Sequence, residues 1–354
     1  MTIARDDLRA AVAAGLIDER QAAGLMALAD ARRGARASLD AREEPFELFR
    51  GFNEIFIVVG LVILFAGWSA LTGLLEFAML GMRGVPAILT AAATMAGLAV
   101  LARYFTLRRR MVAPSIALTV MFALSAAQAG VSLGWVAGLA FGPRFVLAAA
   151  LATVAIGAWY AVFRVPFAMA LVALGVFATA VAVQVSGGAL PEDPADFFLL
   201  TKQGPFAWVT IVIGIAALGG ALWFDMSDPH RVGLRAATGF WLHVIAAPVI
   251  VNTVALSLLE IGTLGAQMAL MLFLAAVALF AVVIDRRSFL VSGVGYVVAL
   301  AVIFLQDGAA LAILGLGLAL VLLGAQWERL RTGLMRALPA FPGKTRLPPW
   351  ETPA

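Results

Sequence analysis

The chain of 354 residues contains no cysteine and only two histidines. The absence of cysteine excludes disulfides, thiolate metal sites, iron–sulfur clusters and covalently attached haem. The histidines are His230, in a predicted loop, and His243, in an apolar run. A bis-histidine haem within one chain is therefore excluded, and zinc catalysis is disfavoured because ligands are too few. We expect neither a metal site nor a cofactor.

Charge is also scarce in this chain. Charged residues make up 13% of the sequence, where a soluble protein carries about 25%. Hydrophobic residues reach 63%, and the mean hydropathy is +0.99. Lysine occurs only at positions 202 and 344, and the richness in arginine, alanine and glycine indicates a high-GC bacterial genome. The opening segment is polar and charged, so no secretory signal is predicted.

The hydrophobic residues are concentrated in ten long runs. A helix needs about 20 apolar residues to cross the hydrocarbon core of a membrane. The sequence therefore predicts an all-α, polytopic transmembrane helix bundle of about ten spans. These spans are expected near 53–75, 84–103, 112–133, 145–163, 166–186, 206–224, 236–259, 264–284, 288–305 and 308–326.

The basic residues fall on one side of these spans. The two ends and the even-numbered gaps carry 22 of the 25 Lys and Arg residues, whereas the odd-numbered gaps carry only Arg83, Arg144 and Lys202. Because positive residues collect in cytoplasmic loops, both termini are predicted to lie in the cytoplasm. With their acids included, the inner side carries 22 − 15 = +7 and the outer side 3 − 6 = −3. This asymmetry indicates contact with an anionic inner leaflet and argues against nucleic-acid binding.

Two polar segments flank the bundle of residues 51–326. Residues 1–50 are predicted to form a cytoplasmic helical hairpin and connector, with Asp18 and Gln21 forming a capping box. Residues 1–44 either dock a protein partner or lie on the membrane surface. Residues 327–354 are predicted to form an interfacial helix and a proline-rich tail. The expected lipid-facing side of this helix contains Trp327, Leu330, Leu334 and Leu338.

Glycine recurs at every fourth position near the third span, at Gly130, Gly134 and Gly138, and again at Gly142. Small residues at this spacing let another helix approach closely, which predicts helix packing. The alternative is a loop, or a broken or re-entrant segment that lines a cavity. The sequence leaves open which of these residues 130–142 form.

Polar residues within the apolar runs are the candidate functional positions. Such groups are costly in a bilayer and are functional hypotheses for that reason. Acids near span ends, such as Asp225 and Asp285, are expected to reach water at the interface, as are Glu76, Glu260 and Asp307. The other candidates lie deeper or carry no charge: Asn53, Glu54, Gln128, Gln184, His243, Pro248 and Asn252.

His243 lies deepest among the ionisable candidates. It follows Arg235 by eight residues, which places it about 12 Å along a helix. Pro248 leaves the carbonyl of Val244 without its helical hydrogen bond, so an ion or water could bind there. We predict a pair between His243 and Glu54. The alternative is that His243 bonds a backbone carbonyl or Asn53, while Glu54 reaches water or Arg50.

Three functions are compatible with this pattern. The leading hypothesis is transport of a small solute or a lipid through the bundle, based on the many spans, the glycine-rich faces and Pro248 within a span. The alternative is a scaffold or regulator that presents residues 1–44 to a partner. An intramembrane enzyme ranks last because no paired catalytic motif is present, so we predict that the chain is not an enzyme. A transporter requires a cavity that is reachable from one side, whereas a scaffold does not.

Short motifs carry one family resemblance. Gly15-Leu-Ile-Asp-Glu-Arg-Gln21 resembles the start of a family of bacterial polytopic membrane proteins that open with a cytoplasmic "G-L-I-x-E-x-Q" segment. Phe240-Trp-Leu-His243 and Leu323-Gly-Ala-Gln-Trp-Glu-Arg329 are similar to segments of related proteobacterial membrane proteins. The resemblance implies a location in the bacterial inner membrane and brings no established activity or site residues.

Overall fold

The computed structural model describes residues 52–79, 84–202, 204–231, 233–305 and 309–350, together with parts of 8–25. The elements in these ranges are helices, and no strand occurs among them. The predicted all-α class is therefore confirmed. The capping box is also present, since the Asp18 amide donates to Gln21 at 3.0 Å and the Gln21 amide donates to Asp18 at 2.6 Å. The other residues of the predicted segment 1–50, apart from these parts of 8–25, lie outside the described residues.

Ten apolar helices follow the predicted spans. Eight of them, α3 to α10, are long and apolar enough to cross a membrane, and α11 and α12 have 18 and 17 residues. The chain is thus a multi-pass membrane protein. The helices are α3 (Phe52–Ala78), α4 (Val85–Ala102), α5 (Val112–Val136), α6 (Phe141–Phe163), α7 (Phe167–Ser186), α8 (Phe206–Ser227), α9 (Leu234–Ile261), α10 (Leu264–Ile284), α11 (Ser288–Leu305) and α12 (Ala309–Ala325).

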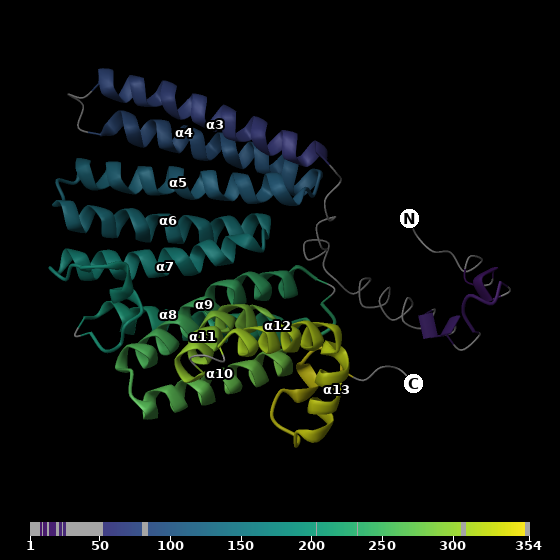
Figure 1. The fold of residues 1–354 in the computed structure, drawn as a ribbon. Helices are drawn as coiled ribbons and strands as arrows, with labels where there is room; N and C mark the ends of the chain where they lie inside the picture. Colours follow the sequence, from purple (N-terminus) through teal and green to yellow (C-terminus); the bar gives the residue numbers. More distant parts are fainter. Residues whose placement is uncertain are drawn as a thin grey trace.

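The helices lie in two groups (Figure 1). Helices α3 to α7 form a row in chain order, and α8 to α12 pack together beside α7. The π-helix Arg103–Arg108 that continues α4, and the turns at 164–166, 228–231 and 285–287, lie at one end of the bundle, which also holds the helix α13 (Trp327–Ala337). We call this end the basic end, because the described arginines of the even-numbered gaps lie there.

Glycine brings α5 and α6 close together. A Cβ atom on Gly130 would lie 2.5 Å from the Ala148 Cα, and one on Gly134 would lie 2.5 Å from the Arg144 Cγ. These two glycines therefore permit the close packing that their spacing suggests. Gly138 has another role: its φ of 69° ends the turn after α5, and no atom crowds it. Within the described residues α5 is one continuous helix, not a broken or re-entrant one.

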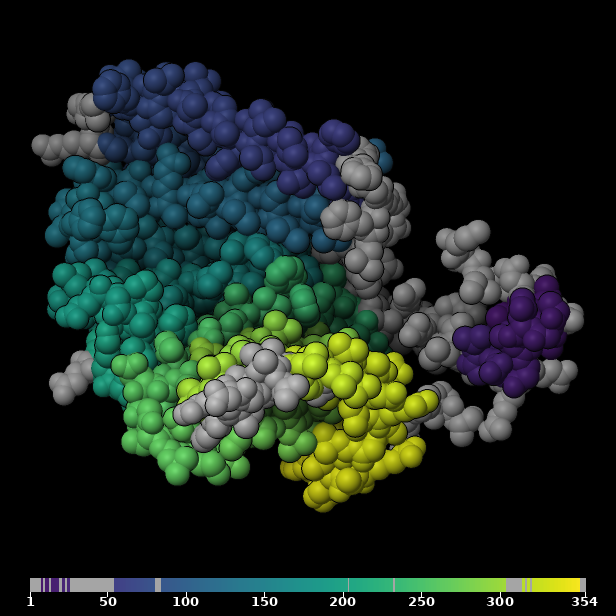
Figure 2. All heavy atoms as spheres, viewed as in Figure 1, coloured from purple at the N-terminus to yellow at the C-terminus, as the bar shows by residue number. Residues whose placement is uncertain are grey.

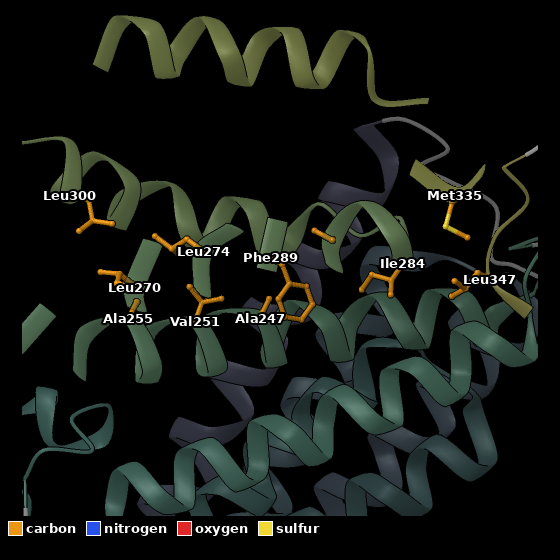
Figure 3. Close-up of a cluster of buried hydrophobic side chains, with 11 residues drawn as sticks. Ala247, Val251, Ala255, Leu270, Leu274, Ile284, Phe289, Leu300, Met335 and Leu347 are labelled. Atoms are coloured by element: carbon orange, nitrogen blue, oxygen red, sulfur yellow. The ribbon is translucent and has the colours of Figure 1, made fainter. Parts of the chain in front are cut away.

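The apolar core of the second group joins α9, α10 and α11 to the C-terminal segment (Figure 3). Val251 of α9, Leu270 of α10 and Phe289 of α11 are buried together, and Met335 and Leu347 extend the cluster toward the basic end. Space-filling atoms show the C-terminal segment lying against the helices beside it (Figure 2). Helix α13 thus packs on protein.

The packing of α13 differs from the predicted lipid-facing stripe. Its buried residues are Trp327, Arg331 and Met335, whereas Leu330 is exposed. The physical reason is that α13 docks on α10, so the face toward α10 is buried instead of the face with the most leucines. Lipid contact by the Leu330 side stays a prediction.

The loop between α7 and α8 lies at the opposite end. It contains a short 3₁₀ helix, Pro194–Phe197, that Asp193 and Asp196 cap in a reciprocal box. The Lys202 ammonium donates to Asp193 at 2.9 Å and also to Asp196. These bonds from Lys202 lower the pKa of both carboxyl groups and raise the pKa of Lys202.

Candidate functional site at the basic end

A cavity of about 1120 Å³ opens among α9, α11, α13 and the turn between α10 and α11. It reaches from Arg286 and Arg287 in that turn to Pro248, which lies at the middle of the 28-residue helix α9. Pro349 and Trp350 of the C-terminal segment also line it. The cavity therefore connects the basic end of the bundle with the depth of its helices.

Four arginines and two acids line the cavity, which gives a formal charge of 4 − 2 = +2. Asp285 organises one wall, because it accepts from Arg231 Nη1 at 2.8 Å and from Trp327 Nε1 at 2.7 Å. Arg231 also donates to the Asp285 carbonyl at 2.9 Å. Burial leaves the positive charge of Arg231 poorly solvated, and this lowers the pKa of Arg231.

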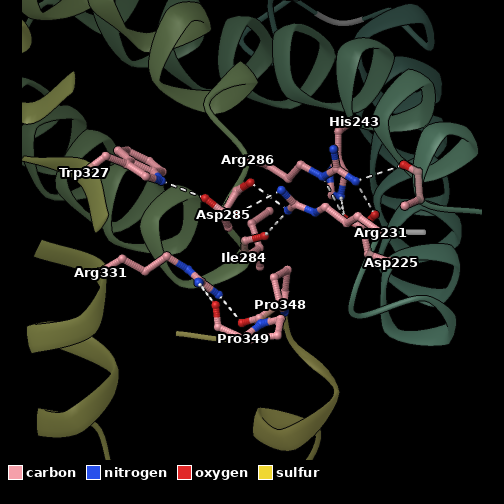
Figure 4. A network of polar contacts seen from close by, with 11 residues as sticks. Asp225, Arg231, His243, Ile284, Asp285, Arg286, Trp327, Arg331, Pro348 and Pro349 are labelled. Carbon is pink, nitrogen blue, oxygen red and sulfur yellow. Dashed lines mark hydrogen bonds and ion pairs between the residues drawn. The ribbon is translucent and has the colours of Figure 1, made fainter. Parts of the chain in front are cut away.

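Behind this wall lies a buried polar network of Asp225, His243 and Arg286 (Figure 4). Asp225 lies in the last turn of α8 and is only 4% exposed. Its carboxylate accepts two bonds from Arg286, one from Nε at 2.9 Å, and lies 2.9 Å from His243 Nε2. A buried carboxylate needs such partners, since an unpaired charge in the protein interior is costly.

Gly239 makes room for this network. A Cβ at this position of α9 would lie 2.4 Å from the Asp225 Oδ1, so any larger residue would displace the carboxylate. Arg286 also donates to the Ala236 carbonyl one turn earlier in α9 at 3.0 Å. The hydrogen bonds of Asp225 and Arg286 therefore hold helices α8 and α9 and the α10–α11 turn together.

The hydrogen bonds of His243 fit one tautomer. Its Nε2 contacts Asp225, whereas its buried Nδ1 has no hydrogen-bond partner among the described residues. A proton on Nε2 donates to the carboxylate and leaves a lone pair on Nδ1, which costs less than an unpaired N–H. The Phe289 ring packs edge-on against the imidazole, with centroids 5.9 Å apart. His243 thus serves as a buried donor to Asp225.

Arg331 is the buried cation of the cavity floor. It is 5% exposed and donates to the carbonyls of Pro349 at 2.9 Å and Pro348 at 2.6 Å. It forms no ion pair with a described residue, and its buried Nε has no hydrogen-bond partner there. Burial lowers its pKa as well. Arg331 therefore holds the C-terminal segment through neutral carbonyls, and no described carboxylate lies within 4 Å of it, although the Asp285 carboxylate acts on its charge at longer range.

The other wall of the cavity is apolar. It includes Phe240, Val244 and Pro248 of α9 and Val291 of α11. Val291 is 76% exposed and Phe240 is 44% exposed. The accessible surface of these side chains is apolar, so it suits contact with hydrocarbon. The cavity thus has a charged floor at the basic end and an apolar side formed by residues of α9 and α11.

Two of the predicted site residues belong to this region. Pro248 lines the cavity, as does Val244, whose carbonyl the proline leaves without its helical bond. His243 lies behind the Arg286 wall. The predicted pairing of His243 with Glu54 is wrong, because the imidazole of His243 is hydrogen-bonded to Asp225 instead. Glu54 instead accepts from the Ala113 amide at 3.3 Å, where a carboxylate stabilises the start of α5.

Most remaining candidates lie elsewhere. Gln128 donates to Glu76 at 3.0 Å, which links α5 to α3, and Thr90 of α4 donates to the same oxygen at 2.6 Å. Glu76 therefore joins three helices and does not rely on water alone. Asn252 accepts from Tyr296 at 2.9 Å. Gln184 is half-buried near the end of α7, and the side chain of Asn53 lies outside the described residues.

Sequence reasoning missed the central position of Asp225. It predicted solvation at the interface for this acid, but Asp225 is buried because Arg286 reaches it from a turn 61 residues later. It also missed Arg331, for which the sequence offers only the amphipathic pattern of α13. The sequence signal that could have indicated this site was the pair of arginines at 286 and 287, directly before an apolar run.

The comparisons with known proteins add no relative. No protein-family model matches the chain, and no curated protein or solved structure matches it significantly.

Proposed function

We propose that the chain is a ten-span protein of the bacterial inner membrane with both termini in the cytoplasm. The 22-to-3 distribution of basic residues supports this orientation. The grouping of the α4–α5, α6–α7, α8–α9 and α10–α11 turns at one end of the bundle supports it further. The basic end then faces the cytoplasm, and its arginines meet the anionic inner leaflet.

Within this frame, the chain transports a lipid or another anionic amphiphile. One observation carries this proposal: a single cavity has an arginine floor at the basic end and an apolar side that exposes Phe240 and Val291. A headgroup fits the floor, and an acyl chain fits the apolar side. A small hydrophilic solute would leave that apolar side without a role, so the lipid is the better substrate of the two predicted.

The alternative functions receive less support from the site. A scaffold that acts through residues 1–44 has no use for a cavity that reaches the middle of α9. An enzyme would need catalytic groups that meet at a bound substrate, whereas the Asp225–His243 pair is buried behind Arg286. The scaffold and the enzyme are the functions to consider if the test below shows no lipid movement.

The test is movement of a fluorescent anionic lipid between leaflets. The full chain is reconstituted in phosphatidylcholine vesicles that contain a trace of headgroup-labelled lipid with a phosphate diester. A membrane-impermeant quencher bleaches only the outer leaflet unless the protein moves lipid between leaflets. We expect quenching to extend to the inner leaflet when the protein is present.

Two variants of α11 provide a matched comparison. Val291→Trp places an indole in the cavity opening, whereas Val302→Trp adds the same group to an exposed position of α11 outside the cavity. Transport should fall for the first variant and persist for the second. Lipid movement that is absent in the wild type, or equal in both variants, would contradict transport through this cavity.

A further inference from the structure

We propose that the cavity floor is a phosphate-binding subsite, formed by Arg287, Arg331 and the N-terminus of α11, so that the substrate is an anionic amphiphile whose headgroup is a phosphate without a cationic substituent such as choline. This inference rests on the proposed function, because it names the chemical class of the substrate in the same cavity. It assigns different tasks to the four arginines of the lining.

Two of the arginines already have carboxylate partners. Arg286 is bound to Asp225, and Arg231 is bound to Asp285. These ion pairs hold the side chains of Arg231 and Arg286 in place, and the carboxylates neutralise most of their positive charge. Arg287 and Arg331 form no ion pair with a described residue. The positive charge available to a ligand therefore lies with them.

Arg331 provides the strongest indication of an anion. A guanidinium that is 5% exposed and bound only to carbonyl oxygens carries a desolvation cost that neutral acceptors offset in part. Its Nε remains without a partner among the described residues while its side chain lines the cavity. An anion in the cavity would supply both a counterion in direct contact and the missing acceptor.

The start of α11 adds donors on the same side. Ser288 is the first residue of this helix and lines the cavity, and its buried Oγ also has no hydrogen-bond partner among the described residues. The first amides of a helix lack intrahelical acceptors, and the helix dipole favours negative charge there. Hydroxyl and backbone donors therefore join the two guanidinium groups.

The geometry favours phosphate over carboxylate. Donors come from the α10–α11 turn, from the first turn of α11 and from α13, so they approach the ligand from three elements. A phosphate group offers several oxygen acceptors in a tetrahedral arrangement, whereas a carboxylate offers two in a plane. Arg287 is exposed and lies with its guanidinium 5.1 Å from the Trp327 ring centroid, so it can turn toward a headgroup at the cavity mouth.

The test measures binding without transport. The full chain is placed in phosphatidylcholine nanodiscs, and binding is followed by native mass spectrometry and by the thermal unfolding midpoint. Four probes are titrated separately: short-chain phosphatidic acid, inorganic phosphate, oleate and additional phosphatidylcholine. We expect phosphatidic acid to bind and raise the midpoint, and oleate and phosphatidylcholine to do so far less.

Three arginine substitutions localise the effect. Arg287→Gln and Arg331→Gln should each weaken phosphatidic acid binding roughly tenfold or more, because each removes a charge-assisted donor. Arg329→Gln is the matched control, since Arg329 lies exposed on α13 outside the cavity and bonds Gln326. It should bind as the wild type does. If Arg331→Gln loosens the C-terminal segment and obscures its result, Arg287→Gln alone decides.

Each outcome has a distinct meaning. Equal binding of oleate, or equal losses in all three variants, would overturn the phosphate subsite. Inorganic phosphate that binds as tightly as phosphatidic acid would uphold the subsite and overturn its assignment to a lipid. Specific binding without lipid movement in vesicles would uphold this inference while the proposed transport function fails. Lipid movement in vesicles together with binding that does not depend on the phosphate group would uphold the transport function and overturn the phosphate subsite.

Discussion

At the residue scale, Asp225 is a buried acid that joins three parts of the molecule. Its two oxygens contact His243 of α9 and Arg286 of the α10–α11 turn, and its own position is near the end of α8. Three stretches of chain that are distant in sequence therefore meet at one carboxylate. Because this carboxylate is buried, a substitution that removes it alone leaves its polar partners unpaired in the protein interior.

Replacement of Asp225 by Ala should be strongly destabilising. It leaves the buried Arg286 without its counterion and His243 without its acceptor, and loss of one partner of a buried pair costs about 3–5 kcal/mol. The measurement is the free energy of unfolding by denaturant in detergent micelles. Glu192→Ala, which removes an exposed carboxylate in the loop before α8, should change stability much less.

A double variant separates pairing from function. Asp225→Leu combined with Arg286→Met replaces the ion pair with apolar groups of similar volume, which is often neutral or stabilising. Stability should therefore recover relative to Asp225→Ala. If the double variant is as unstable as the single one, the ion pair is not the source of the loss.

Gly239→Ala should also destabilise the chain. The added Cβ would meet the Asp225 Oδ1 at 2.4 Å, and overpacking of this kind typically costs about 1–3 kcal/mol. Gly219→Ala, on α8, is the control, because nothing lies within 4 Å of its added Cβ. Thermal midpoints of the two variants should differ, with the control at or above the wild type. Equal midpoints would show that Asp225 has room to move.

At the element scale, α13 and the segment after it act as one unit. Arg331 binds the carbonyls of Pro348 and Pro349, and Thr332 donates to the Trp350 carbonyl at 2.9 Å. Met335 and Leu347 bury their side chains in the same cluster. The segment is thus fastened to α13 at its far end by side-chain bonds to three consecutive carbonyls.

Replacement of Arg331 by Ala should release this segment. The two strongest of these bonds disappear, so trypsin should cleave after Lys344 and Arg346 several times faster than in the wild type. Limited proteolysis followed by mass spectrometry measures this rate. Arg329→Ala removes an exposed arginine from the same helix and should leave the rate unchanged. Unchanged cleavage in Arg331→Ala would show that the apolar contacts alone hold the segment.

The elements themselves were predictable from the sequence, whereas their partners were not. The apolar runs located the apolar helices within a few residues, because helix length in a membrane follows from hydrocarbon thickness. The paired roles of Asp225 and Arg286 could not be found in the same way. Periodicity describes one helix at a time, and this contact joins residues 61 positions apart. The Gly130 and Gly134 spacing did indicate packing, because it constrains only the helix face.

At the scale of the whole molecule, the orientation is open to a direct test. The chain has no cysteine, so single cysteines at Ala37 and Ala195 can be labelled without background. A membrane-impermeant thiol reagent added to whole cells should modify position 195 only. Both positions should react after the cells are lysed. Labelling of position 37 in intact cells would overturn the proposed cytoplasmic location of the N-terminus.

The same question cannot be answered easily with amine reagents, for a reason found in the loop before α8. Acylating reagents attack only the free amine, and Lys202 is held as ammonium by Asp193 and Asp196, which raise its pKa. Lys202 is the only lysine on the proposed outer side. The proposed outer surface of this chain should therefore react very little with amine-acylating reagents, although the Lys202 side chain is 39% exposed.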